Sequence, residues 1–113
     1  MELQQRLSLT AGILLIISGC THLTQLTVYQ HHGHVIAASL FGVVYILLGV
    51  FIIILIKKTW AIIPGAIVPF IGGALGVMRF FFVHANPFSV FHVLLDLVIV
   101  PFCIASIILS RRE

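Results

Sequence analysis

The residues of this chain best suited to chemistry are its histidines, of which there are six in 113 residues. Two of them, His22 and His92, fall inside long apolar stretches, and Asp96 follows the second by four positions. Imidazole is a common metal ligand, and two histidines on facing helices are the arrangement that holds haem in helical bundles. A ligating imidazole usually donates its other N–H to a carboxylate or carbonyl, which is the role predicted for Asp96. These three residues therefore predict a haem or metal site.

The other four histidines lie near the ends of the apolar stretches. Three of them occur in the sequence YQHHGH at residues 29–34. We expect His31 and His32 to be solvated turn residues, because polar side chains in connections usually need no further role. His34 begins the next apolar stretch and could add a third ligand, which would suit Zn or Cu better than haem. His84, at a predicted helix end, is expected to be an interfacial polar residue.

The elements that position these side chains must lie in lipid, because the chain is 61% hydrophobic and only 8% charged. Its mean hydropathy of +1.25 is well outside the range of a soluble domain. A helix that crosses a bilayer needs about 20 apolar residues. Four such stretches are present, at residues 7–28, 35–56, 60–83 and 88–109. We therefore predict an all-α membrane protein, a single domain over residues 1–113 in which four transmembrane helices form an antiparallel bundle.

Other architectures do not fit this pattern. The strands of a β-barrel alternate polar and apolar residues, whereas these stretches are continuously apolar. Helices satisfy their own backbone hydrogen bonds, which lipid cannot do for them. The third stretch is rich in glycine, and we expect these glycines to pack closely against a neighbouring helix. The alternative is that they make room for a flat cofactor.

The basic residues predict which way the bundle faces. Arg6, Lys57, Lys58, Arg111 and Arg112 flank the termini and the middle connection, and the other two connections contain no Lys or Arg. Cytoplasmic connections are enriched in these residues, so we predict cytoplasmic N- and C-termini and a histidine cluster that faces outside the cell membrane. The net charge of +3 then reflects topology and indicates no nucleic-acid partner.

The N-terminal stretch allows a second interpretation. The sequence MELQQR, followed by an apolar run and ISGC, resembles a lipoprotein signal in which Cys20 would be lipidated after cleavage. Cleavage would leave only three spans, so we favour a retained first helix. Cys20 and Cys103 lie at different predicted depths, and we expect both to be free thiols.

Polar and small residues fall on one face of each predicted helix, and lipid forces such faces toward the bundle interior. In the fourth stretch this inward seam is a single heptad stripe, formed by Ser89, His92, Asp96, Ile99, Cys103, Ser106 and Ser110. The first stretch repeats the rhythm with Ser8, Ala11, Leu15, Ser18, His22, Gln25 and Tyr29. The seam of the second stretch consists of His31, His34, Ala38, Phe41 and Tyr45. The seam of the third consists of Gly65, Pro69, Gly72, Gly76 and Arg79.

The predicted site lies where the outer halves of these seams meet. At a rise of 1.5 Å per residue, His22 and His92 both lie about 8–9 Å from the outer helix ends, so their levels match. The predicted cofactor contacts are His22, His92, Arg79 and Tyr45, and the predicted metal ligands are His22, His92 and His34. Asp96 and Gln25 are expected to hold the ligating imidazoles in place.

Arg79 and Asp96 are charged residues at membrane depth, which is costly unless they are paired or functional. They lie about 10 and 15 Å below the outer turn on adjacent helices, close enough to pair directly or through one group between them. A structural ion pair is one interpretation. The other is that Arg79 binds an anion, such as a haem propionate or a substrate carboxylate, through its planar guanidinium.

The favoured hypothesis is a membrane protein that binds haem b, or a Zn or Cu ion, near the outer leaflet for electron transfer, with a membrane redox partner or quinone. No CxxCH, hydrolase or nucleotide-binding motif occurs, which excludes covalent c-type haem. One alternative is a small proton-coupled transporter or channel with His22, His92 and Asp96 as a relay. Others are a structural subunit of a larger complex and an enzyme with a metal-activated water. A homo-oligomer is compatible with each.

Overall fold

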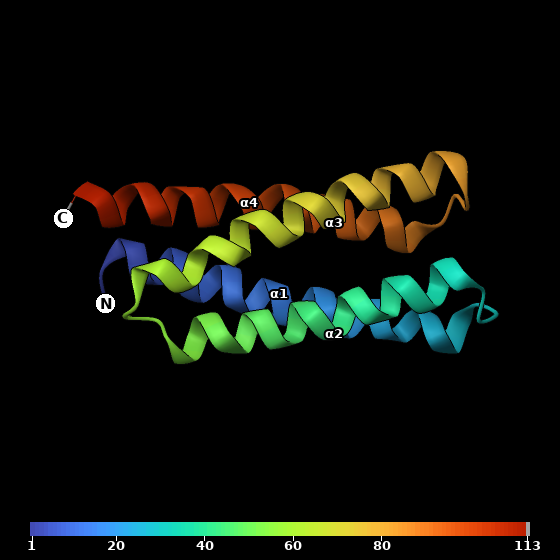
Figure 1. Ribbon diagram of the computed structural model, residues 1–113, viewed down its shortest axis with the longest axis horizontal. Helices are drawn as coiled ribbons and strands as arrows, with labels where there is room; N and C mark the ends of the chain where they lie inside the picture. The colour runs from blue at the N-terminus through green and yellow to red at the C-terminus, as the bar shows by residue number, and fades with distance from the viewer. Residues whose placement is uncertain (113) are drawn as a thin grey trace.

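Four long helices make up most of the chain in the computed structural model, which describes residues 1–112 (Figure 1). They are α1 (Leu3–Val28), α2 (Gly33–Ile54), α3 (Ile63–Phe82) and α4 (Pro87–Arg112). A short 3-10 helix, η1 (Thr59–Ile62), leads directly into α3. With η1 counted into the third span, all four are long and apolar enough to cross a membrane. The prediction of an all-α chain with four membrane-compatible helices is confirmed.

Two helices extend beyond the predicted stretches, α1 at its start and α4 at its end. α1 begins at Leu3 and not at residue 7, and α4 continues to Arg112 and not to residue 109. A buried polar contact accompanies the extra turn of α1, since Gln4 Nε2 donates to Ser106 Oγ at 2.8 Å. Hydropathy detects only the part of a helix that favours lipid, so it missed these polar turns.

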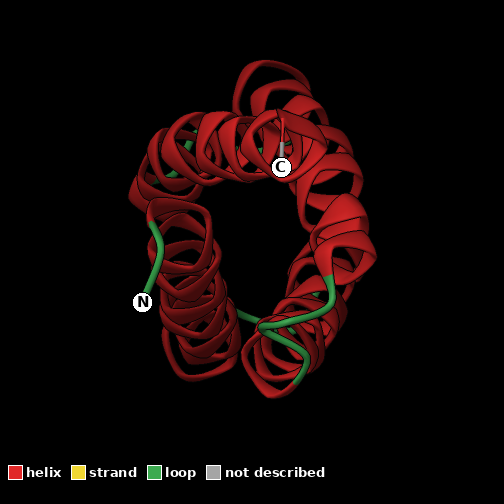
Figure 2. Cartoon of the chain, turned by 90° about the vertical axis from the view of Figure 1, so that its left-hand side faces the viewer, coloured by secondary structure: helices red, strands yellow, loops and turns green. Residues whose placement is uncertain are grey.

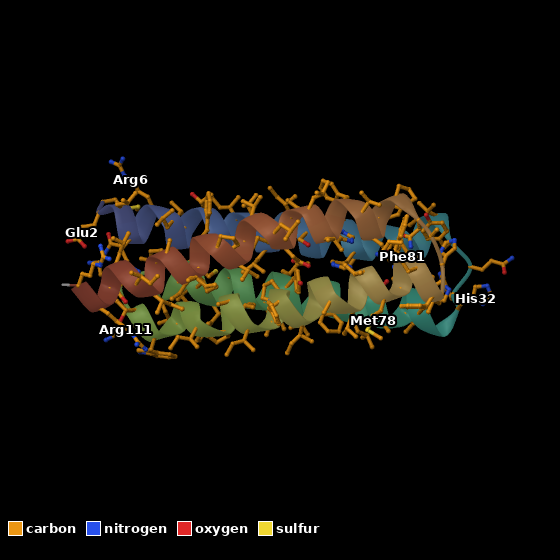
Figure 3. The ribbon with its side chains drawn as sticks, turned by 90° about the horizontal axis from the view of Figure 1, so that it is seen from above. Glu2, Arg6, His32, Met78, Phe81 and Arg111 are labelled. Carbon is orange, nitrogen blue, oxygen red and sulfur yellow. The ribbon has the colours of Figure 1, made fainter. Side chains whose placement is uncertain are left out.

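The two ends of the bundle differ in character. Both termini and the connection that contains Lys57 and Lys58 lie at one end, which we call the lysine end (Figure 1). The connections α1–α2 and α3–α4 lie at the opposite end, the histidine end. Figure 3 shows Glu2 and Arg111 at the lysine end and His32 at the histidine end. Sequence-adjacent helices are therefore antiparallel, as predicted.

Glycines let α1 and α2 pack backbone against backbone. A Cβ atom on Gly19 would lie 2.5 Å from the carbonyl oxygen of Gly42, and one on Gly49 would lie 2.6 Å from the carbonyl oxygen of Gly12. Any side chain at these positions would push the two helices apart. Gly12 and Gly19 are seven positions apart on α1, and Gly42 and Gly49 are seven positions apart on α2. The two glycines of each helix therefore lie on the same face of that helix. This packing face was not predicted, because the predicted seams follow the polar side chains and these four glycines lie beside them.

The helices enclose a common core without packing equally against one another (Figure 2). α1 packs extensively on α2 and α4, and α3 packs on α4, whereas α2 and α3 make few contacts. Figure 1 shows α3 crossing away from α2 toward the histidine end. The bundle is therefore well packed on three sides and loose on the side between α2 and α3.

Burial confirms the predicted inward seam of α4 and most of that of α1, but only part of the other two. The α4 seam is buried at Ser89, His92, Asp96, Ile99, Cys103 and Ser106. In α2 only Tyr45 of the predicted seam is buried, and the buried face passes instead through residues such as Ser39 and Gly42, where α2 packs on α1. In α3 only Gly65 and Pro69 are buried, because the rest of that seam faces the loose side of the bundle. The apolar part of the core surrounds Leu15, Ile52 and Ile99. Both cysteines are free, as predicted.

Candidate functional site

The inward seams of α1 and α4 bring His22 and His92 into contact. Their imidazole rings stack, with centroids 3.6 Å apart and planes inclined by 11°. The contact arises because α1 and α4 pack together and both histidines lie on inward seams at one depth. The prediction that the two histidines share a level is therefore confirmed.

The two stacked histidines differ in their hydrogen bonding. His92 Nε2 lies 2.7 Å from the hydroxyl of Thr21, the residue before His22 on α1. The Nδ1 atom of His22 is buried and has no hydrogen-bond partner within residues 1–112. Its ring meets the Tyr45 ring edge-on, at a centroid distance of 5.4 Å. Thr21 was not predicted to belong to the site, because threonine in a membrane helix usually bonds to its own backbone, as Thr21 also does.

Asp96 bonds to a phenol and not to an imidazole. Tyr45 donates its hydroxyl to Asp96 Oδ1 at 3.0 Å, and both residues are buried. Glycines of α3 leave room for this pair, since a Cβ atom on Gly72 would collide with the Tyr45 hydroxyl and one on Gly73 would touch Asp96. Asp96 thus has a different partner from the one predicted. It lies one turn deeper than His92, where the facing residue is the tyrosine of α2.

Arg79, near the end of α3, reaches across to α1 and α2. Its Nη1 donates to Gln25 Oε1 at 2.6 Å, and its Nε donates to His34 Nδ1 at 3.2 Å. Its Nη2 is buried and lacks a partner among the described side chains, as does Nε2 of Gln25. Arg79 therefore does not pair directly with Asp96, which bonds to Tyr45. Gln25, expected to hold an imidazole in place, holds the guanidinium.

A cavity of about 320 Å³ lies between α2 and α3 at the level of these polar groups. Its polar lining consists of His22, His34, Tyr45, Arg79, Ser89 and His92. The remaining walls are apolar and include Ala38 and Phe41 on α2 and Leu75, Met78 and Phe82 on α3. Met78 and Phe82 are 54% and 83% exposed, so the cavity wall reaches the outer surface of α3, where Figure 3 shows Met78.

The turn histidines divide into two groups. His31 and His32 are exposed, as expected of a solvated turn, and His31 Nε2 lies 2.9 Å from the carbonyl oxygen of Leu26. His84 is half-buried and meets the ring of Tyr29 edge-on at 5.0 Å. Only His34 of the three histidines in YQHHGH contacts Arg79 and lines the cavity between α2 and α3.

The stacked pair does not fit haem as it is arranged. Two axial imidazoles lie on opposite faces of the porphyrin, with their nitrogens directed at the iron between them. Rings stacked face to face at 3.6 Å leave no room between them for a porphyrin. Haem ligation by His22 and His92 therefore stays a prediction, and it would require the two rings to separate.

The described side chains also do not form a ligand set for a Zn or Cu ion. Across residues 1–112, no three or more His, Cys, Asp or Glu side chains are grouped so that they could hold a metal ion. His34, the predicted third ligand, accepts a hydrogen bond from Arg79 through Nδ1. A site for either metal also stays a prediction.

No family model, no curated protein and no solved structure matches the chain. The features that any proposal must explain are the stacked histidines, the buried Tyr45–Asp96 bond, and the arginine beside an apolar cavity.

Proposed function

We propose that the chain is a multi-pass membrane protein that binds a lipid-soluble small molecule in the cavity between α2 and α3. The observation that carries this proposal is the cavity itself, in which apolar walls surround polar side chains from all four helices. Small-molecule sites commonly combine apolar walls with a few polar groups that orient the ligand. A molecule dissolved in the bilayer would reach this site between two helices that make few contacts, without crossing water.

The basic residues support an orientation of the bundle in the cell membrane. Lys57, Lys58, Arg111 and Arg112 lie at the lysine end, and basic connections favour the cytoplasmic side. The histidine end then faces outside, and the cavity lies in the outer half of the bilayer. A ligand dissolved in the outer leaflet would meet the opening directly.

This proposal differs from the haem and metal hypothesis in what it requires of the site. Haem needs the His22–His92 stack to open, and a metal ion needs ligands that do not converge in the described arrangement. A lipid-soluble ligand requires neither change. The cavity volume of about 320 Å³ is near the lower end of the range for small-molecule sites. A membrane quinone belongs to the same class of ligand and needs no iron.

A proton relay across the whole bundle has less support. The polar groups near His22 and Asp96 are separated from the Gln4–Ser106 contact at the lysine end by fully buried apolar residues, among them Leu15 and Ile99. Between Asp96 and Ser106 the helical rise amounts to about 15 Å. Proton transfer over that distance needs intervening polar groups or water, and the core of this segment is apolar.

Photo-crosslinking in lipid vesicles tests the proposed function. The purified protein is reconstituted with one of three diazirine probes, a palmitic acid analogue, the corresponding alcohol or a quinone, and the labelled peptides are mapped by mass spectrometry. We expect at least one probe to label Phe41 and Leu75, which line the cavity, more strongly than Leu97, an exposed residue of α4 outside it.

Two tryptophan variants of α2 provide the matched control. Ala38→Trp would fill the cavity, and we expect it to abolish labelling at Leu75. Leu47→Trp places the same side chain at a position that is 64% exposed and outside the cavity, and it should leave the labelling unchanged. If every probe labels the cavity no more than Leu97 in the wild type, the proposal is wrong and a purely structural role is favoured.

A further inference from the structure

The hydrogen bonds of Arg79 point to the head group of the ligand. We propose that the cavity takes a single-chain lipid acid, whose carboxylate is held by Arg79 and His34, two residues of the cavity lining, with Gln25 behind Arg79. This inference rests on the proposed function and assigns the ligand class of the same site.

The orientation of each polar group around Arg79 follows from the fact that a guanidinium only donates hydrogen bonds. Gln25 must turn its amide oxygen toward Nη1, at 2.6 Å, so its amide nitrogen remains as a donor. His34 must accept through Nδ1, at 3.2 Å, so the proton of its neutral ring lies on Nε2. The polar groups of these three side chains that are not used within the cluster are therefore all N–H donors.

Two of these donors are unsatisfied in the described structure. Arg79 Nη2 and Gln25 Nε2 are buried and have no hydrogen-bond partner in residues 1–112. A buried donor without a partner is destabilising, more so when it carries charge. A group with only acceptor atoms satisfies such a cluster best, and a carboxylate offers two acceptor oxygens in one plane, which matches the planar guanidinium.

The charge of Arg79 is also uncompensated. Both of its hydrogen-bond partners are neutral side chains, and Asp96 bonds to Tyr45. Arginine stays protonated in proteins, so it cannot avoid this cost by losing its proton. A charge at membrane depth is costly unless it is paired, and an anionic head group from the bilayer would pair it.

The position of Arg79 matches the way a lipid acid lies in a leaflet. Arg79 lines the cavity within the last turn of α3, close to the histidine end, and Gly72, two turns earlier, lines it about 10 Å deeper. Between these levels the walls formed by α2 and α3 are apolar side chains such as Phe41 and Leu75, while His22 and His92 line the side formed by α1 and α4. The head would thus lie near the membrane surface and the chain would extend downward between α2 and α3. A small cavity favours one alkyl chain and a small head over a two-chain phospholipid.

The test compares the photoreactive palmitic acid analogue with the corresponding alcohol, at a mildly alkaline pH where the acid is ionised. Loss of a charge-assisted hydrogen bond weakens binding roughly 10- to 100-fold. In the wild type we therefore expect the acid to reach the same labelling as the alcohol at a concentration roughly 10- to 100-fold lower. An equal response to acid and alcohol at the cavity would overturn the inference but leave the proposed function intact. Failure of both probes and of the quinone to label the cavity would reject the proposed function itself.

Two variants test the residues assigned to the head group. Arg79→Gln should remove the preference for the acid, measured as the ratio of the acid and alcohol concentrations that give equal labelling. Gln25→Glu should also remove it, because a carboxylate at position 25 would pair with Arg79 and compete with the ligand. Arg6→Gln removes an exposed cation at the lysine end and should retain the preference. A preference for the acid that survives both Arg79→Gln and Gln25→Glu would contradict the assignment.

Discussion

Replacing Gly72 by alanine tests the contact between α3 and the Tyr45–Asp96 pair. A Cβ atom at position 72 would collide with the Tyr45 hydroxyl, which is held in place by its hydrogen bond to Asp96 at 3.0 Å. Tyr45 is fully buried, so its ring has little freedom to withdraw. We therefore expect Gly72→Ala to destabilise the bundle. Tyr45→Phe should relieve the effect, because it removes the atom that the new methyl group would meet.

The expected free energies follow from this geometry. Overpacking a buried site costs about 1–3 kcal/mol, and replacing a glycine in a helix by alanine returns about 0.5–1 kcal/mol, which leaves a net loss of roughly 1–2 kcal/mol. Tyr45→Phe alone removes one hydrogen bond in a membrane protein, worth about 0.6 and at most about 1.7 kcal/mol. In the double variant the closest remaining contact of the new methyl group is with the ring carbon Cζ at 3.3 Å, so most of the collision is relieved and the double variant should be about as stable as Tyr45→Phe. The two changes should therefore depart from additivity by about 1–3 kcal/mol.

The measurement is the free energy of unfolding in mixed detergent micelles, obtained by titration with dodecyl sulfate and followed by circular dichroism. Gly33→Ala is the matched control, because a Cβ atom there meets nothing within 4 Å. Additive effects of Gly72→Ala and Tyr45→Phe, within about 0.5 kcal/mol, would refute the reasoning. So would a Gly72→Ala variant as stable as Gly33→Ala.

Two further predictions concern orientation and the stacked histidines. In a background without Cys20 and Cys103, a cysteine at Gln30 should react with an impermeant maleimide added to intact cells and one at Thr59 should not, whereas labelling at Thr59 alone would reverse the orientation. The proposed function needs no haem, so we expect the purified protein to show no haem absorption band, and a Soret band that disappears in His92→Ala would support the haem hypothesis instead.

The number of helices and the inward faces of α1 and α4 were predictable because both follow from the solvent and from local geometry. Lipid requires long apolar helices, and a polar residue in such a helix must face other helices. The heptad stripe in α4 therefore predicted the burial of residues such as Ser89 and Ser106. The constant rise of a helix also predicted that His22 and His92 lie at one depth, where they stack.

The partners of the polar side chains were not predictable by the same means. Helical rise gives the depth of a residue, but a hydrogen bond also depends on the rotation of each helix and on side-chain rotamers. Asp96 is one turn from His92 and yet bonds to Tyr45, which lies on another helix. Arg79 lies at a depth that allows pairing with Asp96 and yet bonds to Gln25 and His34.

The amino-acid sequence by itself determined a four-helix chain suited to lipid, its antiparallel order, and the depth at which its polar groups lie. The cavity between α2 and α3 was decided only by the tertiary structure. The glycines of α3 were expected to pack closely against a neighbouring helix, and Gly65 and Gly72 do lie against side chains of other helices, but Gly72 and Gly76 also line the cavity. Backbone-to-backbone glycine packing occurs between α1 and α2, and α3 packs on α4. Whether a side of a bundle closes depends on how near each pair of backbones can approach, and that distance is set by all four helices together.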